Sequence, residues 1–172
     1  MDASSNTGVE PRHRFDLFET GDRTALVCLD QADIQRQVID QLTEMEYRIH
    51  TGMFLDDSTL KLKAHCYDVV VLSEDFNGST LQDHPILKEM IGLPLGYRRR
   101  QIYVLVGSSL QTNDEMQAFA HSVDVVVAVA DISNIRPVIR RTVSRVTDFY
   151  TPLMEVLSGE AVDATPRMIG AR

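Results

Sequence analysis

Polar residues follow three short apolar runs of this sequence, and they are of the kinds that bind metal ions or anions. Asp30 follows the first run, Ser73 and Glu74 follow the second, and Gly-Ser-Ser at residues 107–109 follows the third. Carboxylates such as those of Asp30 and Glu74 are the ligands that Mg²⁺ prefers in proteins. The backbone amides of residues 107–109 could instead hold an anion. Either chemistry requires the ends of these runs to meet in space, so it depends on the fold.

The apolar runs alternate along the chain with segments of helical period. Ile34, Val38, Leu42 and Met45 show this period clearly, because steps of four, four and three place them on one helix face. The run DVVVL at residues 68–72 is instead typical of a strand that is buried on both faces. We predict strands over residues 25–29, 47–51, 68–72, 102–106 and 125–129.

Strict alternation of five strands with five helices predicts βαβ units in an α/β domain. Because crossovers between parallel strands are right-handed, the favoured topology is a doubly wound, flavodoxin-like parallel sheet with the strand order 2-1-3-4-5. Ligands of such sheets bind beyond the carboxyl ends of the strands. We therefore expect Asp30, Ser73 and Gly107 to meet at one edge of the sheet.

The 172 residues suit one domain with flanking tails. We expect a flexible polar arm over residues 1–22, the domain over 23–157, and a disordered tail rich in Gly, Pro and small residues over 158–172. No apolar run approaches the roughly 20 residues that span a bilayer, and the start carries no secretion signal, so a cytoplasmic location is predicted. The net charge of −8 argues against general binding of nucleic acid.

From about residue 24 to 147, the order of these features resembles the receiver domains of bacterial two-component response regulators. The resemblance implies a phosphorylation pocket at the strand ends. Such a pocket needs an acidic pair after the first strand to bind Mg²⁺ and an acceptor aspartate at the end of the third strand. It also needs a Ser or Thr at the end of the fourth strand and a lysine at the end of the fifth strand. In this sequence the pocket is degenerate, because the first three positions hold Asp30 as a single carboxylate, Ser73 with Glu74 after it, and Val106.

The lysine of the pocket is also missing. Lys61, Lys63 and Lys88 are the only lysines, and residues 129–131 after the fifth strand read Val-Ala-Asp. A one-residue slip of the third strand would bring Glu74 inward, but it would also turn every valine of that strand to the other face, so we expect Ser73 at the acceptor position. We therefore predict a pseudo-receiver that takes up no phosphoryl group.

The last helix is predicted to run to about Leu157, well past the length that covers a sheet. Its apolar residues recur at steps of four and three, the spacing of a heptad-like seam. These interaction candidates are Ile139, Val143, Val146, Tyr150, Leu153 and Leu157. The first half of the seam must cover the sheet, and the second half packs on a second copy of the chain or on its own domain. Pro152 is expected to kink the helix, or to begin a separate short one.

Two further groups of residues could bind a partner or a metal ion. Arg98, Arg99 and Arg100 could contact an acidic partner, although such clusters in acidic proteins more often form ion pairs in solvated loops. The adjacent pair His65 and Cys66 lacks the spacing of zinc ligands. No metal site is predicted.

These features together predict a signalling or scaffold protein with no enzymatic activity and no cofactor. Its partners are expected to be a second copy of the chain, in a homodimer, and other signalling or structural proteins. The alternative is a domain of flavodoxin-like shape that binds a nucleotide or anion, or catalyses a reaction, at the strand ends. An α/β domain unrelated to receivers is a further alternative.

Overall fold

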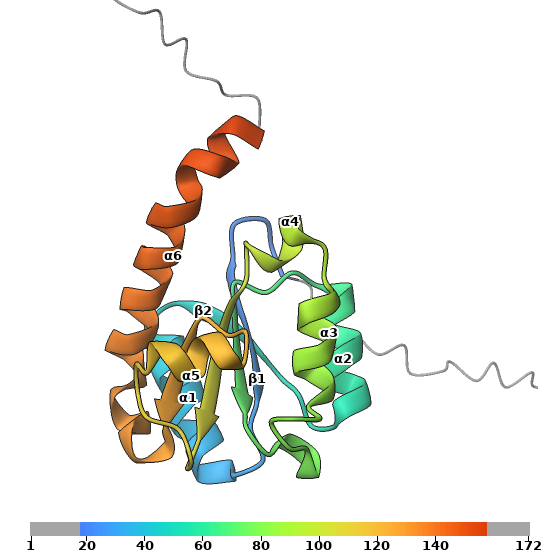
Figure 1. Cartoon of the computed structure of the whole chain (residues 1–172), viewed down its shortest axis with the longest axis vertical. Coiled ribbons are helices and arrows are strands. Elements are labelled where there is room, and N and C mark those ends of the chain that lie inside the picture. Colours follow the sequence, from blue (N-terminus) through green and yellow to red (C-terminus); the bar gives the residue numbers. More distant parts are fainter. Residues whose placement is uncertain (1–17, 158–172) are drawn as a thin grey trace, which may run out of the picture.

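A computed structural model describes residues 18–157 and shows one five-stranded sheet in which every neighbouring pair of strands is parallel (Figure 1). The strand order is 2-1-3-4-5, so the predicted doubly wound α/β topology is confirmed. The strands are β1 (Arg23–Cys28), β2 (Tyr47–Thr51), β3 (Val69–Ser73), β4 (Ile102–Gly107) and β5 (Val125–Ala128). Residues 1–17 of the predicted arm and the whole predicted tail, 158–172, lie outside the described range.

A helix follows each strand, as the alternation predicts. The α-helices are α1 (Ala32–Glu44), α2 (Leu55–Ala64), α3 (Pro85–Gly92), α4 (Leu95–Arg98), α5 (Glu115–Ala120) and α6 (Ile135–Leu157), with 3₁₀ turns η1 (Phe76–Gly78) and η2 (Val129–Asn134). The single turn α4 lies in the connection from α3 to β4 and is the one α-helix that the pattern did not predict. Within residues 18–157, no helix has both the length and the apolar character needed to cross a membrane.

The helices cover the two faces of the sheet, with α1 and α6 on one side and α2 and α3 on the other (Figure 1). Neighbouring residues of each strand face opposite sides. Val69 and Val71 therefore pack with the α1 and α6 side chains, whereas Val70 and Leu72 pack with those of α2, α3 and α5. This double burial explains why the central strands are uninterrupted apolar runs.

Two aspartates close the amino-terminal edge of the sheet. Asp68 precedes β3, and its Oδ2 accepts the backbone N–H of Thr24 at 2.6 Å. Asp124 precedes β5 in the same way, and its Oδ2 accepts the N–H of Tyr103 at 2.8 Å and a bond from Arg98 Nη1 at 3.2 Å. Each carboxylate thus satisfies the backbone donor of the second residue of a neighbouring strand and helps to set the register.

The last helix is continuous through Pro152, and it extends well past the end of the sheet (Figure 1). The expectation of a separate short helix after Thr151 is therefore wrong. Pro152 has no N–H to donate to the carbonyl of Asp148. One residue earlier, the Thr151 hydroxyl donates to the Thr147 carbonyl at 2.7 Å. The helix tolerates the proline because the lost bond lies on an exposed turn, where water can reach the carbonyl.

The segment before β1 is held against the domain by aromatic contacts. The Phe18 ring lies 4.3 Å from the His50 ring and 4.7 Å from the His65 ring, centroid to centroid. His50 and Tyr67 also meet through a 2.8 Å hydrogen bond between Nδ1 and the phenol oxygen. The start of the described chain is therefore packed beside β2 and β3.

We expect Asp124→Ala to lower the free energy of unfolding by about 1–3 kcal/mol, because it leaves the buried Tyr103 N–H without an acceptor and Arg98 without its ion pair. Urea denaturation measures this loss. The matched control is Asp83→Ala, which removes a carboxylate that pairs with Lys88 in solvent and should leave the midpoint almost unchanged. Equal losses for the two variants would contradict this role of Asp124.

Candidate functional site

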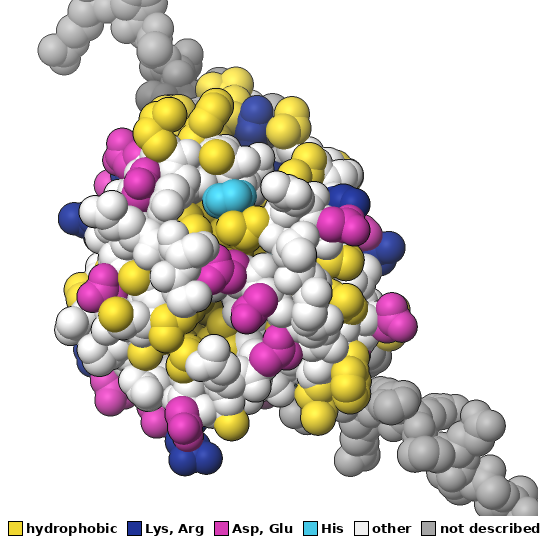
Figure 2. Space-filling model, turned by 60° about the horizontal axis from the view of Figure 1, so that its bottom comes forward, with side chains coloured by type: hydrophobic (Ala, Val, Ile, Leu, Met, Phe, Trp, Pro, Cys, Tyr) yellow, Lys and Arg dark blue, Asp and Glu magenta, His cyan; other side chains and the backbone are white. Residues whose placement is uncertain are grey.

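A hollow of about 480 Å³ lies at the carboxyl ends of the strands. Its lining includes Asp30, Ser73, Glu74 and Val106, the residues of the predicted degenerate pocket, together with Leu29, Gln31, Ile34, Asp75, Gly107, Ser108 and Val129. Acidic side chains gather near the centre of the face in Figure 2, and the basic ones lie at its edges. The negative charge around the hollow therefore repels anions that approach from solvent.

Ser73 stands at the end of β3, with its Cα opposite Val106 of β4. Its hydroxyl donates to Asp75 Oδ1 at 2.8 Å. His84, at the start of α3, donates from Nε2 to the Ser73 carbonyl at 3.0 Å, and burial lowers the pKa of this imidazole. Ser73 is thus fixed by both its side chain and its backbone, and it offers a hydroxyl where a phosphoryl-accepting pocket needs a carboxylate.

The Glu74 carboxylate is bound by the loop that follows β4. Oε1 accepts the backbone N–H groups of Ser108 at 2.7 Å and of Ser109 at 3.2 Å, and also the Ser108 hydroxyl at 3.1 Å. Oε2 accepts the Ser109 hydroxyl. Partial burial raises the pKa of Glu74, but these hydrogen bonds outweigh it and hold the pKa below its usual range. The site therefore favours the charged carboxylate.

Gly107 makes room for this carboxylate. A Cβ at residue 107 would lie 2.4 Å from Glu74 Cδ, 2.5 Å from Oε2 and 2.7 Å from Oε1. Only a bare backbone admits the carboxyl group so close to the strand end. The Gly-Ser-Ser segment at the end of β4 therefore provides both the space and the hydrogen-bond donors for the Glu74 carboxylate.

The register of β3 is the predicted one, yet Glu74 still enters the hollow. Ser73 pairs with Val106 without a slip, and the Glu74 N–H continues the ladder by donating to the Val106 carbonyl at 2.8 Å. Side chains alternate between the two faces only within a strand, and β3 ends at Ser73. The Glu74 side chain is therefore free to extend toward the end of β4. Sequence reasoning placed Glu74 near the pocket and missed its partners, Ser108 and Ser109.

Asp30 holds the loop after β3. Its Oδ2 accepts the N–H of Asn77 at 2.7 Å, and its Oδ1 accepts the Asn77 side-chain amide at 3.0 Å. Asn77 has a φ of +53°, which asparagine tolerates better than most residues. The two carboxylates that could share a Mg²⁺ ion, Asp30 and Glu74, thus bind different loops. Among residues 18–157, no three His, Cys, Asp or Glu side chains are grouped so that they could hold a metal ion.

The other positions of the degenerate pocket carry no charge. Val106 is 1% exposed and has no hydroxyl, and Val129 lines the hollow beyond β5. The lysines lie elsewhere, because Lys61 pairs with Asp57 on α2, Lys63 with Glu89 on α3, and Lys88 with Asp83. Among the described residues, no Lys or Arg lines the hollow.

The arginine cluster before β4 is only partly free for an acidic partner. Arg98 forms an ion pair with Asp124 at 3.2 Å and lies over the Tyr103 ring. Arg99 lies 5.8 Å from the centre of the Tyr150 ring, which joins α4 to the second half of α6. The sequence did not show these internal contacts, because their partners are distant along the chain.

The predicted apolar seam of α6 has a first half that packs on the sheet and a second half that extends beyond it. Ile139 is fully buried, and Val143 and Val146 pack against the same core cluster. Beyond the sheet, Tyr150 and Leu153 are half-buried, and the side chain of Leu157 lies outside the described part of the structure. The first half of the seam thus covers the sheet.

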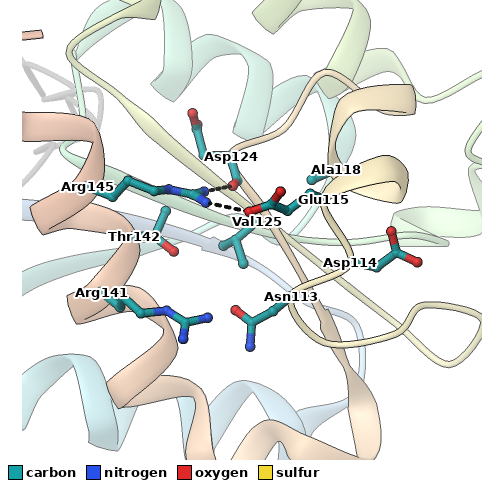
Figure 3. A pocket seen from close by; sticks show the side chains of 9 residues that line it. All are labelled: Asn113, Asp114, Glu115, Ala118, Asp124, Val125, Arg141, Thr142 and Arg145. Carbon is teal, nitrogen blue, oxygen red and sulfur yellow. Dashed lines mark hydrogen bonds and ion pairs between the residues drawn. The ribbon is translucent and has the colours of Figure 1, made fainter. Parts of the chain in front are cut away.

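A second hollow, of about 320 Å³, lies between α5 and α6 over β5 (Figure 3). Arg145 reaches across from α6 to Glu115 Oε1 at 3.3 Å and to the Asp124 carbonyl at 3.1 Å. Arg141 and Asn113 point toward one another at its other end. On α5, two large apolar side chains are exposed, Met116 at 75% and Phe119 at 81%. Sequence reasoning missed these two residues.

The fold is that of known receiver domains. A signal receiver domain of a DNA-binding response regulator from Colwellia psychrerythraea 34H is 15% identical, covers 72% of this chain and 99% of its own, and superposes with a TM-score of 0.57. A Francisella response-regulator receiver domain is 12% identical, covers 72% of this chain and 98% of its own, and has a TM-score of 0.56. An orphan response regulator of H. pylori is 14% identical, covers 72% of this chain and 98% of its own, and has a TM-score of 0.54. This chain has a receiver-like fold. The sequence matches no protein-family model and no curated protein.

We expect Gly107→Ala to displace the Glu74 carboxylate and to lower the free energy of unfolding by about 1–3 kcal/mol, because the added methyl group overlaps the carboxyl atoms. The control is Gly92→Ala at the end of α3, where nothing lies within 4 Å of an added Cβ, and which should be neutral or slightly stabilising. Denaturation curves of the two variants measure the contrast. If Gly107→Ala is as stable as the control, the carboxylate does not occupy this position.

Proposed function

We propose that this protein is a pseudo-receiver, which acts in signalling or as a scaffold by binding other proteins and neither accepts a phosphoryl group nor catalyses a reaction. One observation carries the proposal: Glu74 already occupies the anion-binding amides at the strand ends, beside a serine at the acceptor position. In the receiver pattern, the end of the fourth strand supplies the hydroxyl that senses the phosphoryl group. Here the loop is satisfied by the chain itself.

The alternative function, binding of a nucleotide or another anion at the strand ends, has less support. Its best feature was the set of backbone amides after β4, and Glu74 uses those of Ser108 and Ser109. An external anion would have to displace an attached carboxylate and approach through an acidic face (Figure 2). The pseudo-receiver needs neither step.

We propose that a second copy of the chain binds the surface formed by α5 and α6. A solvent-exposed ion pair between Arg145 and Glu115 joins the two helices. Phe149, 74% exposed, lies one turn after Arg145 on the same face of α6, and Met116 and Phe119 extend the apolar surface along α5. Exposed aromatic groups beside arginines are typical of protein interfaces. The length of α6 beyond the sheet adds surface that the domain alone does not bury.

The proposed location is the cytoplasm. Cys28 and Cys66 are both free thiols, which fits a reducing compartment. Other signalling or structural proteins are proposed as further partners, and they could use the same surface when it is not paired in a dimer.

Light scattering of the full-length protein over a wide range of concentrations tests the interface. The wild type should be a dimer that dissociates on dilution. Phe119→Asp should weaken association by about tenfold or more, because it places a charge within the apolar surface. Its matched control is Ile91→Asp on α3, which is 62% exposed and not part of the proposed α5–α6 surface, and should leave association unchanged. A wild type that is monomeric at every concentration would refute the homodimer, as would equal effects of the two substitutions.

A further inference from the structure

We infer that the loop from Gly107 to Ser109 is a carboxylate-binding site in its own right, that Glu74 is its resident ligand, and that it binds a small external carboxylate when the Glu74 side chain is absent. The inference concerns the chemistry of the loop and holds whether or not the domain forms a homodimer. It goes beyond the loss of phosphorylation, because it assigns a binding activity to residues that the degenerate pocket leaves without a role.

Four donors converge on one carboxyl group. The backbone N–H groups of Ser108 and Ser109 both point to Oε1, at 2.7 and 3.2 Å, and the two hydroxyls of the same residues supply one bond to each carboxylate oxygen. Hydrogen bonds to a charged acceptor are the strong ones in proteins. All four donors come from two consecutive residues of one loop, so a single carboxylate can meet all of them at one place.

The space is also that of a carboxyl group. A Cβ on Gly107 would clash with all three carboxyl atoms of Glu74, at distances of 2.4 to 2.7 Å. The site therefore closely fits a planar group of this size against the backbone of β4. Formate consists of such a group alone, and it can take the place of the Glu74 carboxyl without further atoms.

The neighbouring carboxylates do not compete for these donors. Asp30 binds Asn77, and Asp75 accepts the Ser73 hydroxyl. Both nevertheless line the hollow and contribute negative charge, so they disfavour multiply charged anions. Binding of a singly charged carboxylate is therefore favoured over binding of phosphate.

In the wild type, attachment of Glu74 to the chain excludes external ligands. The tether joins the end of β3 to the neighbouring end of β4, so the effective concentration of its carboxylate far exceeds that of a free one. The substitution Glu74→Ala removes the tether and the ligand together. The loop then has two N–H groups without an acceptor, and an anion that binds them stabilises the folded protein.

The test follows the backbone amide signals of Ser108 and Ser109, and the melting temperature, while formate replaces chloride at constant ionic strength. In Glu74→Ala, the two signals should shift in a saturable way and the melting temperature should rise toward that of the wild type. The wild type and the control Asp75→Ala, which retain Glu74, should show neither change. A folded Glu74→Ala variant that ignores formate overturns the inference, and so does an equal response of all three proteins.

A second variant keeps the test decisive if Glu74→Ala does not fold. In Glu74→Gln the amide oxygen still accepts the loop N–H groups, but it is neutral and a weaker acceptor than a carboxylate. Formate should therefore displace it and shift the two amide signals at concentrations that leave the wild type unchanged. If Glu74→Gln is as resistant to formate as the wild type, the loop has no preference for a carboxylate and the inference fails.

Discussion

The three central strands, β1, β3 and β4, are buried on both faces, and much of the remaining structure follows from this constraint. An apolar residue is required at nearly every position of these strands, so polar chemistry is confined to their ends. At the amino-terminal edge, Asp68 and Asp124 accept backbone N–H groups near the starts of β1 and β4. At the carboxyl edge, Asp30, Ser73 and Glu74 meet the loops from the neighbouring strands.

At the carboxyl edge, internal hydrogen bonds connect the strand ends to the loops. Asp30 holds the loop after β3 through Asn77, and Glu74 holds the loop after β4 through Ser108 and Ser109. These are contacts that a reversible phosphorylation pocket would leave open for a metal ion and a phosphoryl group. A permanent carboxylate in the loop after β4 fixes one arrangement of that loop. The surface of α5, which the loop leads into, is accordingly expected to keep one form.

Much of the fold could be predicted because local pattern and burial agree. The five strands appear where the β-branched runs predict them, and the Asp114 carboxylate caps α5 as its position before the helix suggests. The position of Ser73 followed from the alternation of Val69 to Leu72. The absence of a lysine after the fifth strand could be predicted from the positions of the three lysines alone.

The rest depends on contacts that local pattern does not encode. Glu74 leaves the strand and crosses to Gly107, where the rule of alternating faces no longer holds. Arg98 and Arg145 find their acceptors more than twenty residues away in sequence. The spacing of α6 showed which residues share a face, but only the structure showed that Tyr150 lies beside Arg99 and that Phe149 faces solvent.

The central claim is that the strand-end site is closed to phosphoryl chemistry by its own carboxylate. The most direct measurement treats the full-length protein with Mg²⁺ and acetyl phosphate, and records its intact mass together with the amide signals of Ser108 and Ser109. The account predicts no added phosphoryl group and no shift of either signal. A mass increase of one phosphoryl group on an aspartate, with both signals displaced, would contradict it and would show a working receiver.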